Sequence, residues 1–301
     1  MKKLSGIILL TIVIFTGCRS MPALLPADKR ITWLPADSKV FLNVNIDGNR
    51  ELFNRTITKM GIDNKDLQSI IDRSHTVCLG LENPLDLADP GIHMISEGEY
   101  NSGMMKLGLR VSKDWAQTDR ESGTITNAEA GIQIVPEKGK ILFSEGKIDE
   151  ILTNRVDPVP VYLPRDVRDH FIESDIILYY PQPSRDVLTA LSPNLADLEV
   201  DLFYISMNKV EPVAEGEEPE YEIMGLVRMK DITKTRPFST ALKWVILGVV
   251  VSSENPDTKQ FLKTIKIDTQ WNDVELSGLN LSLEMASDMI SNVIKLDIYE
   301  K

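Results

Sequence analysis

The feature that most constrains the fold is an order of strand-like and helix-like segments that runs through the chain twice. The first pass begins at Leu34 with "LPADSKVFLNVN", and the second begins at Leu163 with "LPRDVRDHFIESDIILYYP". Each pass continues with helical segments, strands that carry apolar residues at alternate positions, and a closing helix. This order predicts an α+β fold made of two tandem, divergent copies of an antiparallel sheet covered by helices, with the helices on one face of each sheet.

Local likeness within the chain supports the predicted duplication. Residues 106–110, "KLGLR", resemble residues 224–228, "MGLVR", and both are predicted to be strands. Between the two passes lies "RVDPVPVYLPRD", whose prolines prevent regular structure and stiffen the chain. We therefore expect a first repeat over residues 32–155, a proline-rich link over 156–162 and a second repeat over 163–301.

The amino end has the parts of an export signal. Lys2 and Lys3 are followed by an apolar run from Ile7 to Phe15 and then by small residues. The run is too short to cross a membrane, because a spanning helix needs about 20 apolar residues. The sequence thus predicts a segment that is removed on export.

The signal ends in "FTGC", residues 15–18, which resembles the lipobox of bacterial lipoproteins. In that motif a peptidase cuts before the cysteine, and the cysteine carries acyl chains. The resemblance implies a lipoprotein signal peptide over residues 1–17, lipid attachment at Cys18 and a lipidated tether over residues 18–31. The alternative is an ordinary secretory signal in which Cys18 has no role.

Acylation of Cys18 has physical consequences for the whole chain. A single acyl chain binds a membrane only marginally, whereas two or more hold a protein there permanently. The residue after Cys18 is Arg19, not the aspartate that retains enteric lipoproteins in the inner membrane. This favours the outer membrane of a bacterial cell envelope, with the folded part facing the periplasm.

Taken together, the lipobox, the "LPADSKVFLNVN" opening and the tandem pattern resemble exported envelope lipoproteins of spirochaetes, treponemes in particular. In size and general pattern the chain is similar to a membrane-inserting treponemal outer-membrane lipoprotein. The resemblance implies attachment to the envelope. No catalytic residues carry over from it.

Charge restricts the partners of the chain. The formal net charge is −12, and loss of Lys2 and Lys3 with the signal takes it to −14. Such a charge excludes nucleic acid as a partner and argues against electrostatic binding to anionic lipid. Attraction to a membrane must then be apolar or covalent.

Residues with catalytic or metal-binding chemistry are scattered. His75, His93 and His170 lie far apart without a second ligand at a metal-binding spacing. The sequence has no phosphate-binding glycine loop, no G-x-S-x-G elbow and no paired-cysteine motif. Cys78 lies in a strand-like run and is predicted to be a buried core residue. We expect no enzyme activity, no cofactor and no metal.

An apolar insertion, residues 237–251, distinguishes the second repeat. Pro237 suits a first helical turn, and 14 or so residues at 1.5 Å each reach about 21 Å, too little to cross a bilayer of about 30 Å. The candidate membrane contacts in it are Phe238, Leu242, Trp244, Val245, Ile246 and Val249. Packing of this segment into the protein core is the alternative interpretation.

Two functional hypotheses follow from these features. In the first, a lipid-anchored envelope lipoprotein contacts the membrane through residues 237–251 and binds or moves lipid. In the second, a soluble periplasmic module is held only by its acylated Cys18 and binds an envelope protein. An enzyme is the third and least supported hypothesis.

Overall fold

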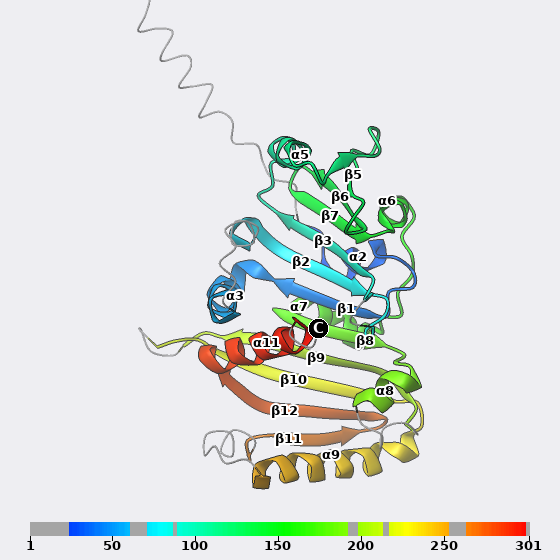
Figure 1. Ribbon diagram of the computed structural model, residues 1–301. Helices are drawn as coiled ribbons and strands as arrows, with labels where there is room; N and C mark the ends of the chain where they lie inside the picture. Colours follow the sequence, from blue (N-terminus) through cyan, green and yellow to red (C-terminus); the bar gives the residue numbers. More distant parts are fainter. Residues whose placement is uncertain are drawn as a thin grey trace, which may run out of the picture.

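The computed structural model describes residues 24–60, 71–86, 89–191, 198–212, 217–252 and 263–298. Cys18 and the predicted signal peptide lie outside the described residues. The fold is α+β, with helices packed on one large antiparallel sheet of 12 strands (Figure 1).

Elements of the first half alternate between strands and short helices. The strands are β1 (Val40–Asn45), β2 (Ser74–Leu81), β3 (Ile92–Gly98), β4 (Ala116–Gln117), β5 (Ile125–Asn127), β6 (Ile132–Glu137) and β7 (Lys140–Glu145). The helices are α2 (Ala27–Arg30), the 3-10 turn η1 (Ile31–Trp33), α3 (Ile46–Met60), α5 (Ser102–Val111) and α6 (Ile148–Val156).

Elements of the second half follow after the proline-rich link. The strands are β8 (Ile176–Pro181), β9 (Val200–Val210), β10 (Glu220–Met229), β11 (Lys266–Gln270) and β12 (Asp273–Ser282). The helices are α7 (Arg165–Glu173), α8 (Arg185–Leu191), α9 (Ile232–Ser252) and α11 (Leu283–Ile298).

The two halves form one continuous sheet, so the prediction of a separate sheet in each repeat was wrong. β1 pairs antiparallel with β8, with Leu42 opposite Leu178. Left apart, each half would present an edge strand with a row of unpaired backbone N–H and C=O groups, and the β1–β8 pairing removes both edges. Outward from this join the strand order is β1-β2-β3-β7-β6 in one half and β8-β9-β10-β12-β11 in the other.

Residues 106–110 belong to a helix, not to the strand that their likeness to residues 224–228 predicted. They lie on α5, whereas residues 224–228 lie on β10. α5 begins after Asn101, whose side-chain oxygen accepts hydrogen bonds from the backbone N–H groups of Gly103 and Met104 at 3.1 and 3.2 Å. An asparagine in this position satisfies backbone donors that have no partner within the helix, and so favours a helix start.

Side chains on alternate strand positions divide the sheet into two faces. We call one the α7 face, because α2, η1, α6 and α7 pack there against side chains such as Phe41 and Tyr179. We call the other the α3 face, because α3, α8 and α11 pack there against side chains such as Tyr221 and Tyr180. Helices thus cover parts of both faces, whereas the sequence predicted cover on one.

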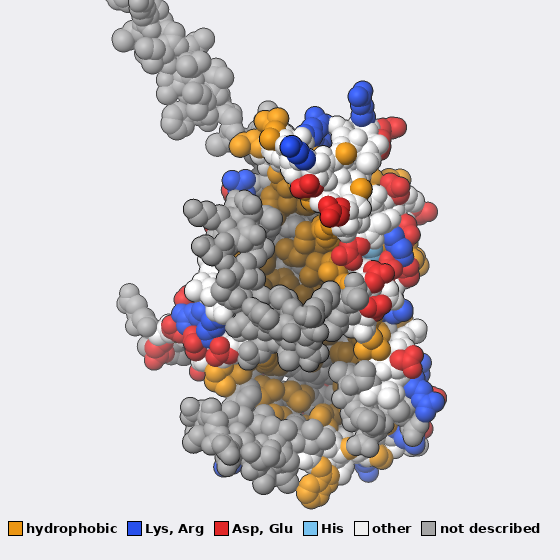
Figure 2. Space-filling view, viewed as in Figure 1, with side chains coloured by type: hydrophobic (Ala, Val, Ile, Leu, Met, Phe, Trp, Pro, Cys, Tyr) orange, Lys and Arg blue, Asp and Glu red, His pale blue; other side chains and the backbone are white. Residues whose placement is uncertain are grey.

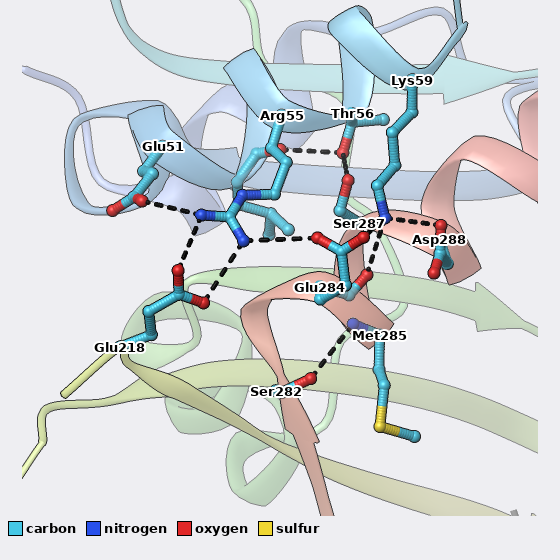
Figure 3. A network of polar contacts seen from close by, with 11 residues as sticks. Glu51, Arg55, Thr56, Lys59, Glu218, Ser282, Glu284, Met285, Ser287 and Asp288 are labelled. Atoms are coloured by element: carbon cyan, nitrogen blue, oxygen red, sulfur yellow. Dashed lines mark hydrogen bonds and ion pairs between the residues drawn. The ribbon is translucent and has the colours of Figure 1, made fainter.

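A polar cluster links α3 of the first half to α11 and the β9–β10 connection of the second (Figure 3). Arg55 binds Glu218 at 3.0 Å and Glu284 at 3.3 Å, and Lys59 binds Glu284 and Asp288, each at 2.6 Å. The three carboxylates are more than half exposed and the two cations are partly exposed, so these ion pairs are in contact with solvent and contribute little.

Beneath the charges, apolar contacts join the same two helices. Leu52 of α3 is fully buried and belongs to one cluster with Leu283 and Ala286 of α11. Hydrophobic burial at Leu52 therefore stabilises the contact between the halves more than the ion pairs above it do.

This ranking predicts the effects of two substitutions on the free energy of unfolding. Leu52→Ala should lower it by about 2–5 kcal/mol, because the change leaves a cavity between α3 and α11. Arg55→Met should have a much smaller effect, present at low salt and lost at high salt. Urea unfolding at low and high salt measures the free energy of unfolding of each variant. An equal, salt-sensitive decrease in that free energy for the two variants would contradict the ranking.

Candidate functional site: an apolar sheet face and two exposed helices

An apolar row crosses the α3 face of the central strands. The strand registers align one side chain from each of seven neighbouring strands into this row. Its members, in spatial order from β9 to β6, are Ile205, Leu178, Leu42, Leu79, Met94, Phe143 and Ile134. Six of them are half-buried, and Ile205 is 51% exposed. At about 4.8 Å per strand, the row extends over roughly 29 Å.

The opposite face of the same strands is packed differently. There the neighbouring register row contains Cys78, Ile95, Leu142 and Val135, all with no exposed surface. Figure 2 shows the α3 side, where hydrophobic side chains gather in a hollow over β2, β3 and β7. An antiparallel sheet normally pairs one apolar face with a polar one, so a second apolar face marks a surface that needs cover.

Helix α5 carries a second group of unburied apolar side chains. Met104, Leu107 and Val111 are 67%, 65% and 78% exposed, and no residue of α5 is fully buried. Their spacing places them along one stripe of the helix, because side chains three and four residues apart lie on the same face. The stripe faces solvent, and the flanking Arg110 is exposed as well.

The start of the described chain is fixed near the same end of the sheet. The buried Arg30 of α2 binds Glu97 of β3 at 3.1 Å and Asn43 of β1 at 3.0 Å. Glu97 also accepts a hydrogen bond from the backbone N–H of Leu25 at 3.0 Å. β3 leads directly into α5, so the first described residues lie nearer to α5 than to α9.

Helix α9 contains the six residues predicted as membrane contacts, and it lies along the opposite end of the sheet (Figure 1). Phe238 is half-buried against a cluster with Leu188 and Met229, and Leu242 is half-buried too. Trp244 is 67% exposed. The side chains of Val245, Ile246 and Val249 lie outside the described ones. The structure therefore joins Phe238 to the core and leaves Trp244 at the surface.

The bounds of α9 differ from the prediction. The helix begins at Ile232, so Pro237 lies inside it rather than in the first turn. Its neighbours Thr235 and Ser239 are buried. None of the helices in the described ranges is long and apolar enough to cross a bilayer.

Side chains that could act in catalysis or metal binding are buried or lie far apart within the described residues. The His93 ring is fully buried, with Nδ1 2.8 Å from Ser144 Oγ and Nε2 2.6 Å from Glu82 Oε1. Ser144 is fully buried as well, so its hydroxyl has no route to a substrate. Cys78 is buried as predicted, and burial raises the pKa of its thiol to about 12. Within the described residues no group of three His, Cys, Asp or Glu side chains is arranged to hold a metal ion.

The fold is similar to that of the treponemal protein TP0453. Crystal form III of TP0453 matches with a TM-score of 0.60 at 15% identity, over 90% of this chain and 99% of that one. Form IV gives 0.59 over 89% and 97%, and form I gives 0.55 over 90% and 98%, both at 15% identity. At this identity the likeness is one of fold, and to that extent it supports the resemblance to treponemal proteins.

Comparison by sequence adds nothing further. No protein-family model matches the chain, and no curated protein sequence matches it.

Sequence reasoning missed the apolar row and the stripe on α5. A signal for the row exists in strands that are apolar at both odd and even positions, such as Ile141, Leu142 and Phe143 of β7. For α5, the spacing of Met104, Leu107 and Val111 is helical, but the alternation of residues 106–110 favoured a strand.

The apolar row predicts binding of a neutral, environment-sensitive dye such as Nile red. Met94→Glu, within the row, should weaken dye binding by about tenfold, because burial of a methionine side chain contributes about 1.5–3 kcal/mol. Ala128→Glu, in the exposed β5–β6 turn, serves as the charge-matched control. Unaltered dye affinity in Met94→Glu, measured by fluorescence titration, would show that the row is not the apolar binding surface.

Proposed function

We propose that the chain is a lipid-anchored lipoprotein of the bacterial cell envelope, with a non-catalytic role in membrane contact and lipid binding. The observation that carries the proposal is the apolar row on the α3 face. It consists only of aliphatic, methionine and phenylalanine side chains, so a ligand gains hydrophobic burial along its whole length. The fold likeness to TP0453 is consistent with an envelope role.

Acyl chains are the ligand that best fits this row. One leaflet of a bilayer is about half of the 30 Å hydrocarbon core, so an acyl chain reaches roughly 15 Å. The row, at about 29 Å, accommodates such a chain laid across the strands. A net charge of −12 disfavours anionic groups, whereas hydrocarbon is indifferent to charge.

Membrane contact is proposed to involve the end of the sheet that holds α5. Acyl chains on Cys18 would bring this end to the lipid surface, in the outer membrane and facing the periplasm. There the exposed stripe of Met104, Leu107 and Val111 enters the headgroup boundary as an interfacial helix, with Arg110 beside it. α9 lies farther away, since seven strand steps, about 34 Å, separate β3 from β11.

We further propose that residues 32–155 and 163–301 are divergent copies of one unit. The support is the equal strand order on either side of the β1–β8 join and the equivalent positions of α5 and α9. Both helices connect the third strand of their half to the outer strands, and both expose large apolar side chains. The exposed helices are then a shared property of the unit.

The proposed anchor predicts the behaviour of two cysteine variants in the cell. Cys18→Ser should block incorporation of labelled fatty acid and leave the precursor unprocessed. No acylated mature protein should then appear in the detergent phase. Cys78→Ala is the control and should be labelled normally, because its thiol is buried. Labelling of Cys18→Ser at the normal level would end the lipoprotein interpretation.

Membrane contact is tested with a chain that starts at Arg19 and contains every described element. It should sediment with phospholipid vesicles, and Leu107→Asp should weaken this binding by about tenfold without changing the thermal midpoint, because Leu107 is mostly exposed. Trp244→Asp tests α9 in the same way. Thr240→Asp, an exposed change on α9, is the charge-matched control.

Each result of the vesicle experiment selects an interpretation. Loss in Leu107→Asp alone supports contact through the α5 end, and loss in both variants supports a protein lying along its α5–α9 length. Loss in Trp244→Asp alone restores the original hypothesis of contact through residues 237–251. An unmodified chain that never binds vesicles would leave the alternative, a periplasmic protein-binding module held only by its lipid.

A further inference from the structure

A groove on the α7 face of the second half has features of a small-molecule site. Its volume is about 420 Å³, within the range of ligand pockets. α7 forms one wall with Asp166 and His170, the β11–β12 hairpin forms the other, and β9 and β10 form the floor. The groove lies on the opposite side of the sheet from the apolar row, so it is independent of the proposed lipid site.

Aromatic rings line this groove. Tyr204 on the floor is 3% exposed and lies beside the His170 ring, with the ring centroids 5.5 Å apart. Trp271, at the tip of the β11–β12 hairpin, is 80% exposed. Its backbone φ of 55° belongs to a conformation that hairpin turns normally give to glycine or asparagine. A tryptophan there is unfavourable for the turn and puts a large apolar ring in water beside the groove.

Negative charge predominates along the same walls. Arg228 is bound by Asp273 through two contacts of 2.7 and 2.8 Å and by Asp166 at 2.5 Å, so its positive charge is already neutralised. Glu275 lines the groove and faces Asp268 directly across the β11–β12 pairing. Like charges in directly opposed positions repel, and neither carboxylate has an ion pair within the described part of the chain. A cation between them would remove the repulsion.

The Tyr204 hydroxyl provides a second, independent indication of a ligand. Burial raises the pKa of Tyr204 to about 12, with Glu275, Asp166 and Asp273 adding to the effect, so the group stays a neutral donor. None of the described residues forms a hydrogen bond with this hydroxyl, although the side chain is almost completely buried. The hydroxyl is the part of Tyr204 that remains open to the groove, where an oxygen on a bound molecule would accept its hydrogen bond.

We propose that this groove binds an amino alcohol of the choline or ethanolamine type, either free or as a phospholipid headgroup. The ammonium group contacts the exposed ring of Trp271 and the carboxylate of Glu275, as cations do in aromatic sites. An oxygen of the ligand accepts the hydrogen bond from Tyr204. The groove excludes anionic ligands, because its carboxylates outnumber the one guanidinium.

Calorimetric titration of the full-length protein in a non-ionic detergent, with millimolar choline as the probe, tests the proposal. Choline should bind, and its uncharged isostere 3,3-dimethylbutan-1-ol should bind about tenfold more weakly or not at all. Absence of choline binding, or equal binding of the isostere, overturns the proposal.

Three variants assign the binding to the groove. Glu275→Gln removes the charge at nearly constant shape, and Trp271→Asn removes the ring while placing a residue suited to positive φ in the turn. Each should weaken choline binding by about tenfold, and Trp271→Asn should keep or raise the thermal midpoint. Glu129→Gln, an exposed change in the first half, should bind choline normally. Normal choline binding by Glu275→Gln overturns the assignment.

Comparison of free choline with phosphatidylcholine distinguishes a lipid headgroup from a free amino alcohol as the ligand. If Glu275→Gln and Trp271→Asn weaken both titration by choline and retention on phosphatidylcholine vesicles, while phosphatidylglycerol vesicles are unaffected, the ligand is a headgroup. If only choline binding weakens, the ligand is a free amino alcohol. Either result supports the proposal, and neither depends on the apolar row.

Discussion

The pairing of β1 with β8 is the interaction on which the rest of the structure depends. It joins two half-sheets through four registered residue pairs and turns two exposed edges into the middle of one sheet. The apolar row exists only because of this join, since Leu42 of one half and Leu178 of the other are adjacent members of it. On the α3 face, the contact between α3 and α11 also joins the two halves, with Leu52 buried in it.

A single sheet also determines how the candidate binding surfaces are separated. The apolar row lies on the α3 face, and the groove around Tyr204 lies on the α7 face, so a ligand on one side cannot contact the other. The two exposed helices lie at the two ends of the strand order, with α5 over β6 and α9 along β11. The buried Arg30–Glu97 pair holds the first described helix at the α5 end of the sheet, and this is why the proposed membrane contact involves that end.

Sequence patterns predicted the α+β class, a closing helix for each pass, which corresponds to α6 in the first half and α11 in the second, and the burial of Cys78. These are local features, set by periodicity and turn residues. The join of the sheets was not predictable in this way, because strand pairing between halves depends on contacts distant in sequence. α5 was misassigned because Leu107 and Leu109 alternate with polar residues and glycine as in a strand. The helix is favoured instead by the Asn101 cap and by the helical spacing of Met104, Leu107 and Val111.

The candidate surfaces show the same division between local and distant information. An exposed Trp244 was foreseeable from an apolar segment, but the half-burial of Phe238 against Leu188 required α8 and α9 to meet at the end of the sheet. The groove on the α7 face combines α7 with a hairpin about 100 residues later, and its charge pattern appears only when the registers place Glu275 opposite Asp268. Each of those carboxylates alone is an ordinary surface residue. Only in the folded sheet do they repel each other across the strand pairing beside the exposed ring of Trp271, and this combination favours a cationic ligand.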